Sequence, residues 1–111
     1  MPLQLNQAKR TAPIFAALGD PVRLGFVIRL GRDGPLPTLA LQQTTELTRQ
    51  AVTKHLRLLE RAGLLRSART GRERTWELKP ARFVEVQAHL AEISAQWDAA
   101  LLRLKVLVER E

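Results

Sequence analysis

The segment from Thr48 to Arg74 constrains the fold more than any other part of this chain. It contains an amphipathic stretch behind a capping threonine, a glycine stop, and two short arginine-bearing stretches on either side of Gly71. Eight of the chain's 18 Lys and Arg residues lie here, but only Glu60 and Glu73 of its 11 Asp and Glu residues, so most of the formal net charge of +7 is concentrated in this segment. This order of segments predicts a helix followed by a basic hairpin, a combination suited to binding duplex DNA.

Composition restricts the class of protein further. At 111 residues, with 45% hydrophobic and 26% charged residues, the chain is an ordinary single globular domain. Its basic charge favours an anionic partner, either nucleic acid or an acidic membrane surface. With no cysteine, the chain has no disulfide, thiolate metal site or cysteine nucleophile. Lacking a signal-peptide core or a run of roughly 18 apolar residues, the chain is expected to be cytoplasmic, without a membrane partner.

The first half of the sequence predicts three helices. Residues 1–10 are expected to form a flexible arm, followed by a short helix from Thr11 or Ala12 to Leu18. Asp20 and Pro21 then cap and start a second helix that runs to about Leu30. Its expected buried side chains are Val22, Phe26, Val27 and Leu30. Gly25 inside this helix predicts close contact with a neighbouring helix, and a short helix over residues 38–43 is expected to bury Leu39 and Leu41.

The second half predicts a recognition helix, a hairpin and a long final helix. The recognition helix, about 49–62, is capped by Thr48 and turns Val52, Leu56 and Leu59 inward. The hairpin, about 65–78, has strands at 65–69 and 74–78, with Trp76 and Leu78 on one side. The last helix, about 81–109, carries an apolar seam that is longer than one small core can cover. We expect this seam to be a dimer interface, formed by Phe83, Val86, Leu90, Ile93, Trp97, Leu101 and Leu104 and continued by Val108.

The order of these elements, and several short motifs, resemble the ArsR family of bacterial transcriptional regulators. The matching motifs include ALGDPVRL at 17–24, TRQAVTKHL at 48–56, AGLL at 62–65 and WEL at 76–78. The resemblance implies a mainly α fold with a two-stranded β-hairpin wing, a winged helix-turn-helix in one domain over 11–111. It also implies a homodimer that binds an inverted repeat in promoter DNA, usually as a repressor. The family's metal-sensing cysteine pair is absent around Thr38, so the resemblance is to a cysteine-free, metal-independent branch.

The expected DNA contacts fall into two groups. Arg49, Gln50 and Thr53, near the start of the recognition helix, are candidates for reading base edges. Candidates for phosphate or minor-groove contacts are Lys54 and Arg57 on the helix and Arg69, Arg72 and Arg74 on the hairpin. Thr48 belongs to this set through its place at the helix start. The alternatives are a solvated helix face and edge-strand charges that only prevent aggregation.

Two histidines and several scattered carboxylates are the candidates for other chemistry. His55 is expected to pack on the helix with a backbone or phosphate hydrogen bond. His89, with Glu85 and Glu92, has the spacing of a metal site on one helix face. The resembled family's version of such a site needs a second histidine further along the helix, and none follows His89, so we expect three surface residues and no metal or cofactor. No phosphate loop or nucleophile elbow is present, so no enzyme is predicted. The remaining alternative is a winged-helix interaction module that docks on an acidic protein. The sequence does not indicate an inducer.

Overall fold

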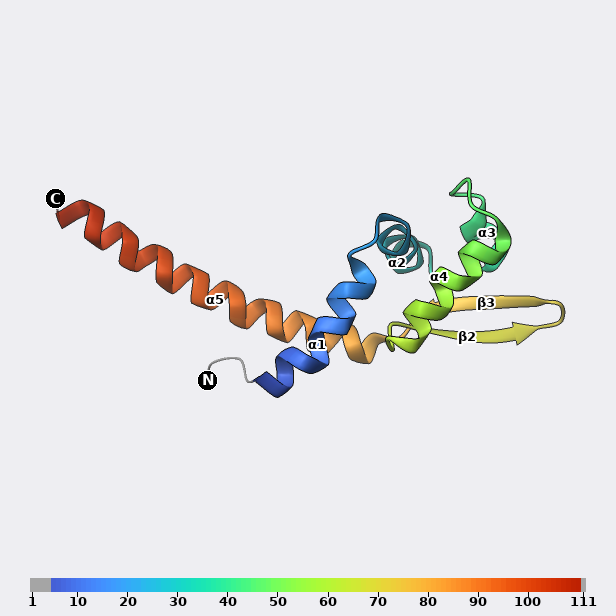
Figure 1. Cartoon of the computed structure of the whole chain (residues 1–111), viewed down its shortest axis with the longest axis horizontal. Helices are drawn as coiled ribbons and strands as arrows, with labels where there is room; N and C mark the ends of the chain where they lie inside the picture. Colours follow the sequence, from blue (N-terminus) through green and yellow to red (C-terminus); the bar gives the residue numbers. More distant parts are fainter. Residues whose placement is uncertain (1–4, 111) are drawn as a thin grey trace.

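The computed structural model describes residues 5–110, in which α-helices pack against a small antiparallel sheet. Figure 1 shows the hairpin at one end of the molecule and the final helix projecting from the other, over extents of 67 × 28 × 21 Å. The elements are α1 (Leu5–Leu18), α2 (Pro21–Asp33), β1 (Leu36–Pro37), α3 (Thr38–Gln42), α4 (Arg49–Arg61), β2 (Leu65–Thr70), β3 (Glu73–Leu78) and α5 (Pro80–Arg110).

Helix α1 is longer than the sequence predicted. It begins at Leu5 instead of Thr11 or Ala12, so the predicted arm over 1–10 is wrong for residues 5–10, while residues 1–4 lie outside the described part of the chain. Two contacts join α1 to α5 where the added residues meet the predicted helix: Arg10 Nη2 lies 3.0 Å from Glu85 Oε1, and Thr11 Oγ1 lies 2.6 Å from His89 Nδ1. The polar sequence of residues 5–10 did not predict this helical extension.

Helix α2 starts as predicted, because the Asp20 carboxylate accepts a hydrogen bond of 3.0 Å from the backbone N–H of Arg23. Phe26 and Leu30 are buried, and Val22 and Val27 pack against the core. The helix continues beyond Leu30 to Asp33 and stops at Gly34, whose φ is +79°. The expected close contact at Gly25 is wrong: a Cβ built there meets no atom within 4 Å.

Helices α3 and α4 form the helix-turn-helix. The predicted short helix is confirmed over Thr38–Gln42, with Leu41 fully buried, but Leu39 is 47% exposed instead of buried. A helix this short turns only one side to the core, and that side carries Leu41. In α4 the predicted inward stripe is confirmed, because Val52, Leu56 and Leu59 are each 0% exposed.

The predicted hairpin is confirmed, and a third strand joins it. Strands β2 and β3 pair in antiparallel register, with Ser67 opposite Trp76 and Arg69 opposite Arg74, and each strand is one residue longer than predicted at the turn. The short β1 pairs with the other edge of β3, where Leu36 lies opposite Trp76, which gives the order β1-β3-β2. Two residues that include a proline are too short a pattern to predict a strand. Trp76 is therefore enclosed at the centre of the sheet.

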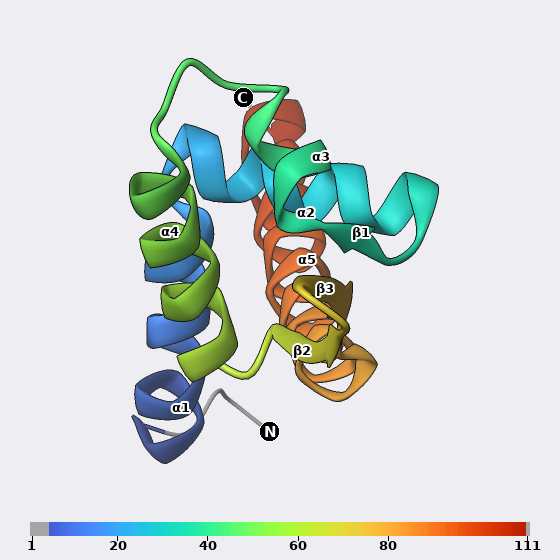
Figure 2. The same ribbon diagram turned by 90° about the vertical axis from the view of Figure 1, so that its right-hand side faces the viewer.

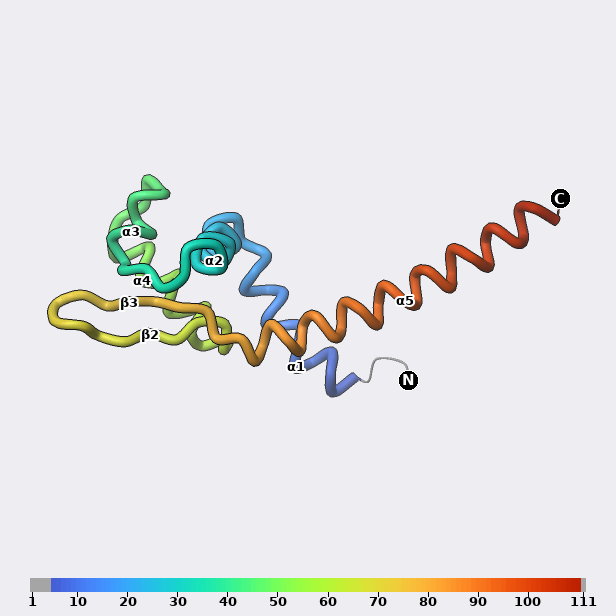
Figure 3. Tube along the Cα trace, turned by 180° about the vertical axis from the view of Figure 1, so that it is seen from behind, coloured from blue at the N-terminus to red at the C-terminus, as the bar shows by residue number. Residues whose placement is uncertain are grey.

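Helix α5 starts in the core and then leaves it. Val86 is buried at 6% exposure and Phe83 packs against the core, whereas Leu90, Trp97, Leu101 and Leu104 are exposed at 48% or more. Figure 3 shows the second half of α5 running away from all other elements. Within residues 5–110 no single helix is long and apolar enough to cross a membrane; α1 and α2 meet that test only as a pair bent by 93°.

Candidate nucleic-acid interface

The exposed face of α4 gathers the predicted base-reading side chains. Arg49, Gln50, Thr53 and Lys54 line one groove of about 450 Å³ at the start of the helix. Thr48 has a different function, since its Oγ1 accepts a hydrogen bond of 3.1 Å from the backbone N–H of Ala51. The side chain of Thr48 therefore caps α4 and fixes where the helix begins.

A second groove, of about 190 Å³, lies between α4 and the hairpin. Helix α4 contributes Arg49, Thr53 and Arg57 to its lining, and the hairpin contributes Arg69, Arg72 and Arg74. The structure therefore brings the helical and hairpin candidates together on one surface, the end turned towards the viewer in Figure 2. Arg49 and Thr53 line both grooves, so the two predicted groups of DNA contacts are continuous.

The basic side chains of this surface differ in how far they are already engaged. Arg57 Nη1 lies 2.8 Å from Glu60 Oε1, Arg74 Nη1 donates to Ser67 Oγ at 2.9 Å, and Arg69 Nε donates to the Gly71 carbonyl at 3.3 Å. Within residues 5–110, no hydrogen bond or ion pair engages Arg49, Lys54 or Arg72. These three side chains keep all their N–H donors for a ligand.

Glu60 joins the recognition helix to the hairpin, and sequence reasoning did not single it out. Its Oε2 accepts a hydrogen bond of 2.7 Å from Ser67 Oγ on β2, and the same Ser67 hydroxyl accepts from Arg74 on β3. The Ser67 hydroxyl, followed by Arg57 and Arg74, lowers the pKa of the Glu60 carboxyl. Glu60 thus holds Arg57 directly and Arg74 through Ser67.

Trp76 supports the interface from beneath. Its indole Nε1 donates to Thr38 Oγ1 at 2.9 Å, and both residues line the groove between α4 and the hairpin. The guanidinium of Arg57 lies over the same indole. The sequence predicted Trp76 only as an inward strand residue; its links to α3 and α4 span 38 and 19 positions, and no local pattern could indicate them.

Both histidines have intramolecular partners. His55 Nδ1 lies 3.2 Å from Arg23 Nη1 and 4.0 Å from Asp20 Oδ2, so it packs as predicted but with a side-chain partner instead of a backbone one. Asp20 itself has a lowered pKa, mainly because the backbone N–H of Arg23 donates to it. His89 bonds to Thr11, and Glu85 pairs with Arg10 and Arg82. Glu85 and His89, two of the three residues considered as metal ligands, therefore have other partners.

Comparisons with known proteins agree with this geometry. A helix-turn-helix domain model matches residues 18–68. A solved structure of an ArsR-like transcriptional regulator from Rhodococcus sp. RHA1 is 30% identical to this chain, and the match covers 98% of this chain and 99% of the other, with a TM-score of 0.79. Another structure, of an ArsR family transcriptional regulator, is 32% identical over 88% of this chain and 97% of its own, with a TM-score of 0.72. The chain belongs to the ArsR family.

Relatives of this ArsR-family protein are transcriptional regulators, a class without enzymatic activity. The HTH-type transcriptional regulator NmtR of Mycobacterium tuberculosis is 35% identical over 77 residues. The aligned residues make up 69% of this chain and 63% of NmtR, so the chain spans less than two thirds of that relative. Family membership establishes a winged helix-turn-helix regulator with the fold predicted from its sequence.

Proposed function

We propose that this ArsR-family protein is a sequence-specific repressor that binds double-stranded DNA as a homodimer on an inverted-repeat operator. The observation that carries the proposal is the joining of α4 and the hairpin into one arginine-lined surface. A helix in the major groove reads bases through residues near its N-terminus, and adjacent arginines neutralise phosphates. Arg49, Gln50 and Thr53 occupy the first of these positions and the hairpin arginines the second.

The exposed seam of α5 supports the homodimer. Leu90, Trp97, Leu101 and Leu104 are exposed in the single chain, and together with Ile93 they extend the apolar stripe that begins at Phe83 and Val86. A contiguous apolar stripe of this length is a typical protein interface. A second copy of the chain presents the same stripe, so the two surfaces match in chemistry and length. The repressor assignment rests on the resemblance to the family, in which repression is usual.

Selection of bound sequences from a random duplex pool tests the proposal. We expect enrichment of an inverted repeat whose half-sites match recognition helices about 34–36 Å apart. Salt titration of the selected duplex should show affinity falling steeply, because phosphate contacts release counterions. A failure to enrich any duplex, together with tight binding to an acidic protein, would replace the proposal with the interaction-module alternative. Sedimentation of the free protein as a pure monomer would contradict the homodimer.

A further inference from the structure

Another cavity lies apart from the two grooves of the arginine-lined surface. It is a groove of about 490 Å³ between one side of α2 and the segment that connects α3 to α4, here named the α2 groove. Helix α2 provides most of the lining, and Thr44 and Thr45 provide the rest. None of the nine residues predicted to contact DNA lines it. Its volume falls within the range of about 300–1,000 Å³ found for small-molecule sites.

Gly25 keeps the α2 groove open. It lies in the middle of α2, where glycine is less stable than alanine because it loses more backbone freedom on folding. Its φ is not positive, and a Cβ built on it meets no atom within 4 Å, so neither backbone conformation nor packing requires glycine here. The absence of a side chain at Gly25 leaves space along the groove.

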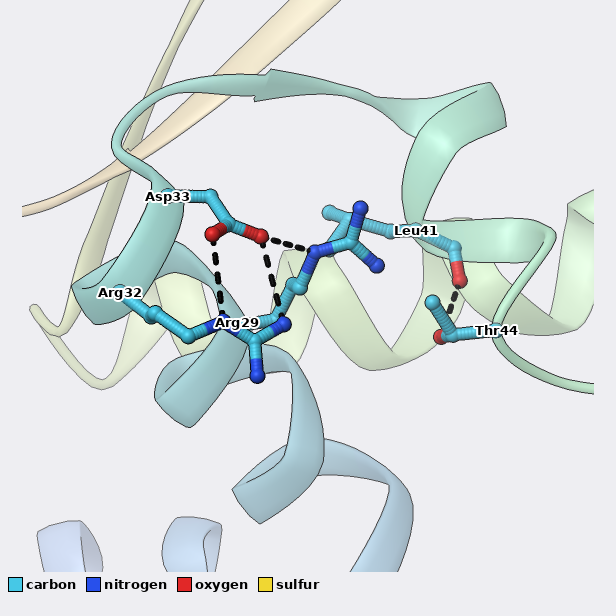
Figure 4. A network of polar contacts seen from close by, with 5 residues as sticks. All are labelled: Arg29, Arg32, Asp33, Leu41 and Thr44. Atoms are coloured by element: carbon cyan, nitrogen blue, oxygen red, sulfur yellow. Dashed lines mark hydrogen bonds and ion pairs between the residues drawn. The ribbon is translucent and has the colours of Figure 1, made fainter.

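The lining combines an apolar floor with two cations. Phe26, in the middle of α2, is buried and Ile28 is 59% exposed at the surface, so apolar groups extend from the core to solvent. Arg29 and Arg32 also line the groove. The Asp33 carboxylate bonds both arginines, as Figure 4 shows, yet Asp33 is not part of the lining.

The arginine pair retains capacity for a ligand. The carboxylate of Asp33 takes the Nε donors of both arginines and one terminal nitrogen of Arg32. Each guanidinium has five N–H donors in a fork that suits a carboxylate, so other donors remain. Two guanidinium groups against one carboxylate leave this end of the groove with a positive charge.

We propose that the α2 groove binds a small organic acid, with its apolar body against Phe26 and Ile28 and its acid group on Arg29 and Arg32. The position of the threonines links the groove to α4. Thr44 Oγ1 donates to the Leu41 carbonyl at 2.7 Å, Thr45 Oγ1 donates to the Gln42 carbonyl at 3.1 Å, and Thr45 Oγ1 accepts from the Leu47 N–H at 3.1 Å. Thr48, the cap of α4, follows directly.

A ligand in the groove therefore touches the connection that sets the angle between α3 and α4. If it binds one arrangement of this connection more tightly than another, it shifts the population of α4 orientations and hence the affinity for DNA. This regulatory step rests on the proposed function, whereas binding of the acid to the groove does not.

The probe for the test is 1-anilinonaphthalene-8-sulfonate, an aromatic acid that fluoresces when it leaves water. In Gly25→Met a flexible side chain fills the groove, and in Arg32→Gln the more exposed cation is removed. We expect each variant to bind the probe about tenfold more weakly than the wild type, about what loss of one charged contact or of the groove volume produces. Leu24→Ala is the matched control on α2, because Leu24 is 42% exposed but does not line the groove.

A second control addresses the other exposed apolar patch. Arg103 lies beside Leu102, Val106 and Leu107 on α5, so Arg103→Gln weakens the probe only if it binds there. A loss confined to Arg103→Gln, or unchanged affinity in Gly25→Met or Arg32→Gln, overturns the proposed site. Arg32→Gln keeps the proposal testable even if Gly25→Met does not fold.

The regulatory step has its own measurement. We expect the probe to change duplex affinity in the wild type and to have no effect on Gly25→Met. If the ligand-free Arg32→Gln variant binds random duplex more weakly with a shallower salt dependence, the arginine pair contacts DNA phosphate and the proposed site is overturned. If no duplex binds any variant while the probe still binds the wild type, the proposed function fails and the acid site stands.

Discussion

The guanidinium carbon of Arg57 lies 5.3 Å from the centroid of the Trp76 ring, so a side chain of the recognition helix lies over an aromatic ring of the central strand. Glu60 holds the same guanidinium from the other side. Because the Trp76 indole also donates to Thr38, one buried ring contacts both α3 and Arg57 of α4, which we predict to contact phosphate. Because these contacts already hold the Arg57 side chain in place, less side-chain conformational entropy is lost when DNA binds.

The first prediction concerns Arg57→Lys. Lysine keeps the charge but loses the planar fork and the stacking on Trp76. We expect duplex affinity to fall by roughly 1 kcal/mol, to the same extent on random and selected sequences, because phosphate contacts carry no sequence information. Fluorescence anisotropy on both duplexes measures this. Arg61→Lys, at the exposed end of α4, is the control and should change little; a loss restricted to the selected sequence would make Arg57 a base-reading residue.

The second prediction compares Arg49→Ala with Arg72→Ala. The first should relax sequence preference by about 1–3 kcal/mol, and the second should mainly reduce the salt dependence, by about one phosphate. Since both side chains line one groove, the double variant should also show a non-additive loss. A double-mutant cycle on the selected duplex provides the measurement. Additive losses would mean that the two arginines contact separate parts of the DNA.

Locally determined features were predictable from the sequence. The caps at Asp20 and Thr48 each form the expected side-chain bond to a backbone N–H three residues later. The inward stripe of α4 follows from helical spacing alone. The stop at Gly63 follows from the ability of glycine to adopt a positive φ, which is +82° there. These patterns involve residues within one or two turns of each other, and the charge cluster pointed to the same segment as the interface.

Features that depend on distant residues were not predictable. Helix α1 contacts α5 through Arg10 and Thr11, whose partners lie 75 and 78 positions away in the chain. The short β1 exists because β3 offers it a free edge, and the bond between Glu60 and Ser67 requires α4 and β2 to be packed already. At Gly25, composition alone could not distinguish a tight contact from an open groove.

The third prediction uses the lowered pKa of Glu60. A carboxyl whose pKa is lower in the folded state contributes stability that is complete above its ordinary value of 4.5 and is lost as the pH falls through its folded value. We therefore expect Glu60→Gln to lower the free energy of unfolding by about 1–2 kcal/mol at pH 7. The difference from the wild type should narrow below pH 4.5. Thermal melts across pH check this, with Glu73→Gln as an exposed control. A difference between the wild type and Glu60→Gln that stays constant with pH would mean that the charge of the Glu60 carboxylate does not contribute to stability.

The fourth prediction separates the dimer seam from the core. Trp97 is 66% exposed in one chain, whereas Val86, on the same seam, is 6% exposed and belongs to the core. Under the proposed homodimer, Trp97→Ala should weaken association by about 2 kcal/mol or more and leave the fold of each chain intact. Val86→Ala should instead lower stability, by an amount on the order of 2 kcal/mol. Analytical ultracentrifugation measures the association of the chains, and denaturant melts measure their stability. If the Trp97→Ala variant sediments like the wild type, Trp97 is not part of the dimer interface.

The fifth prediction is that alanine substitutions at two glycines change the free energy of unfolding in opposite directions. Gly25→Ala adds a methyl group to open space in a helix, so it should raise the free energy of unfolding by about 0.5–1 kcal/mol. Gly63→Ala should lower it by about 1–2 kcal/mol, because φ there is +82° and the new Cβ would lie 3.1 Å from the Arg82 side chain. Urea midpoints of the two variants measure both effects. If Gly25→Ala is instead destabilising, the helix face at Gly25 is packed against another group, and the α2 groove is not open.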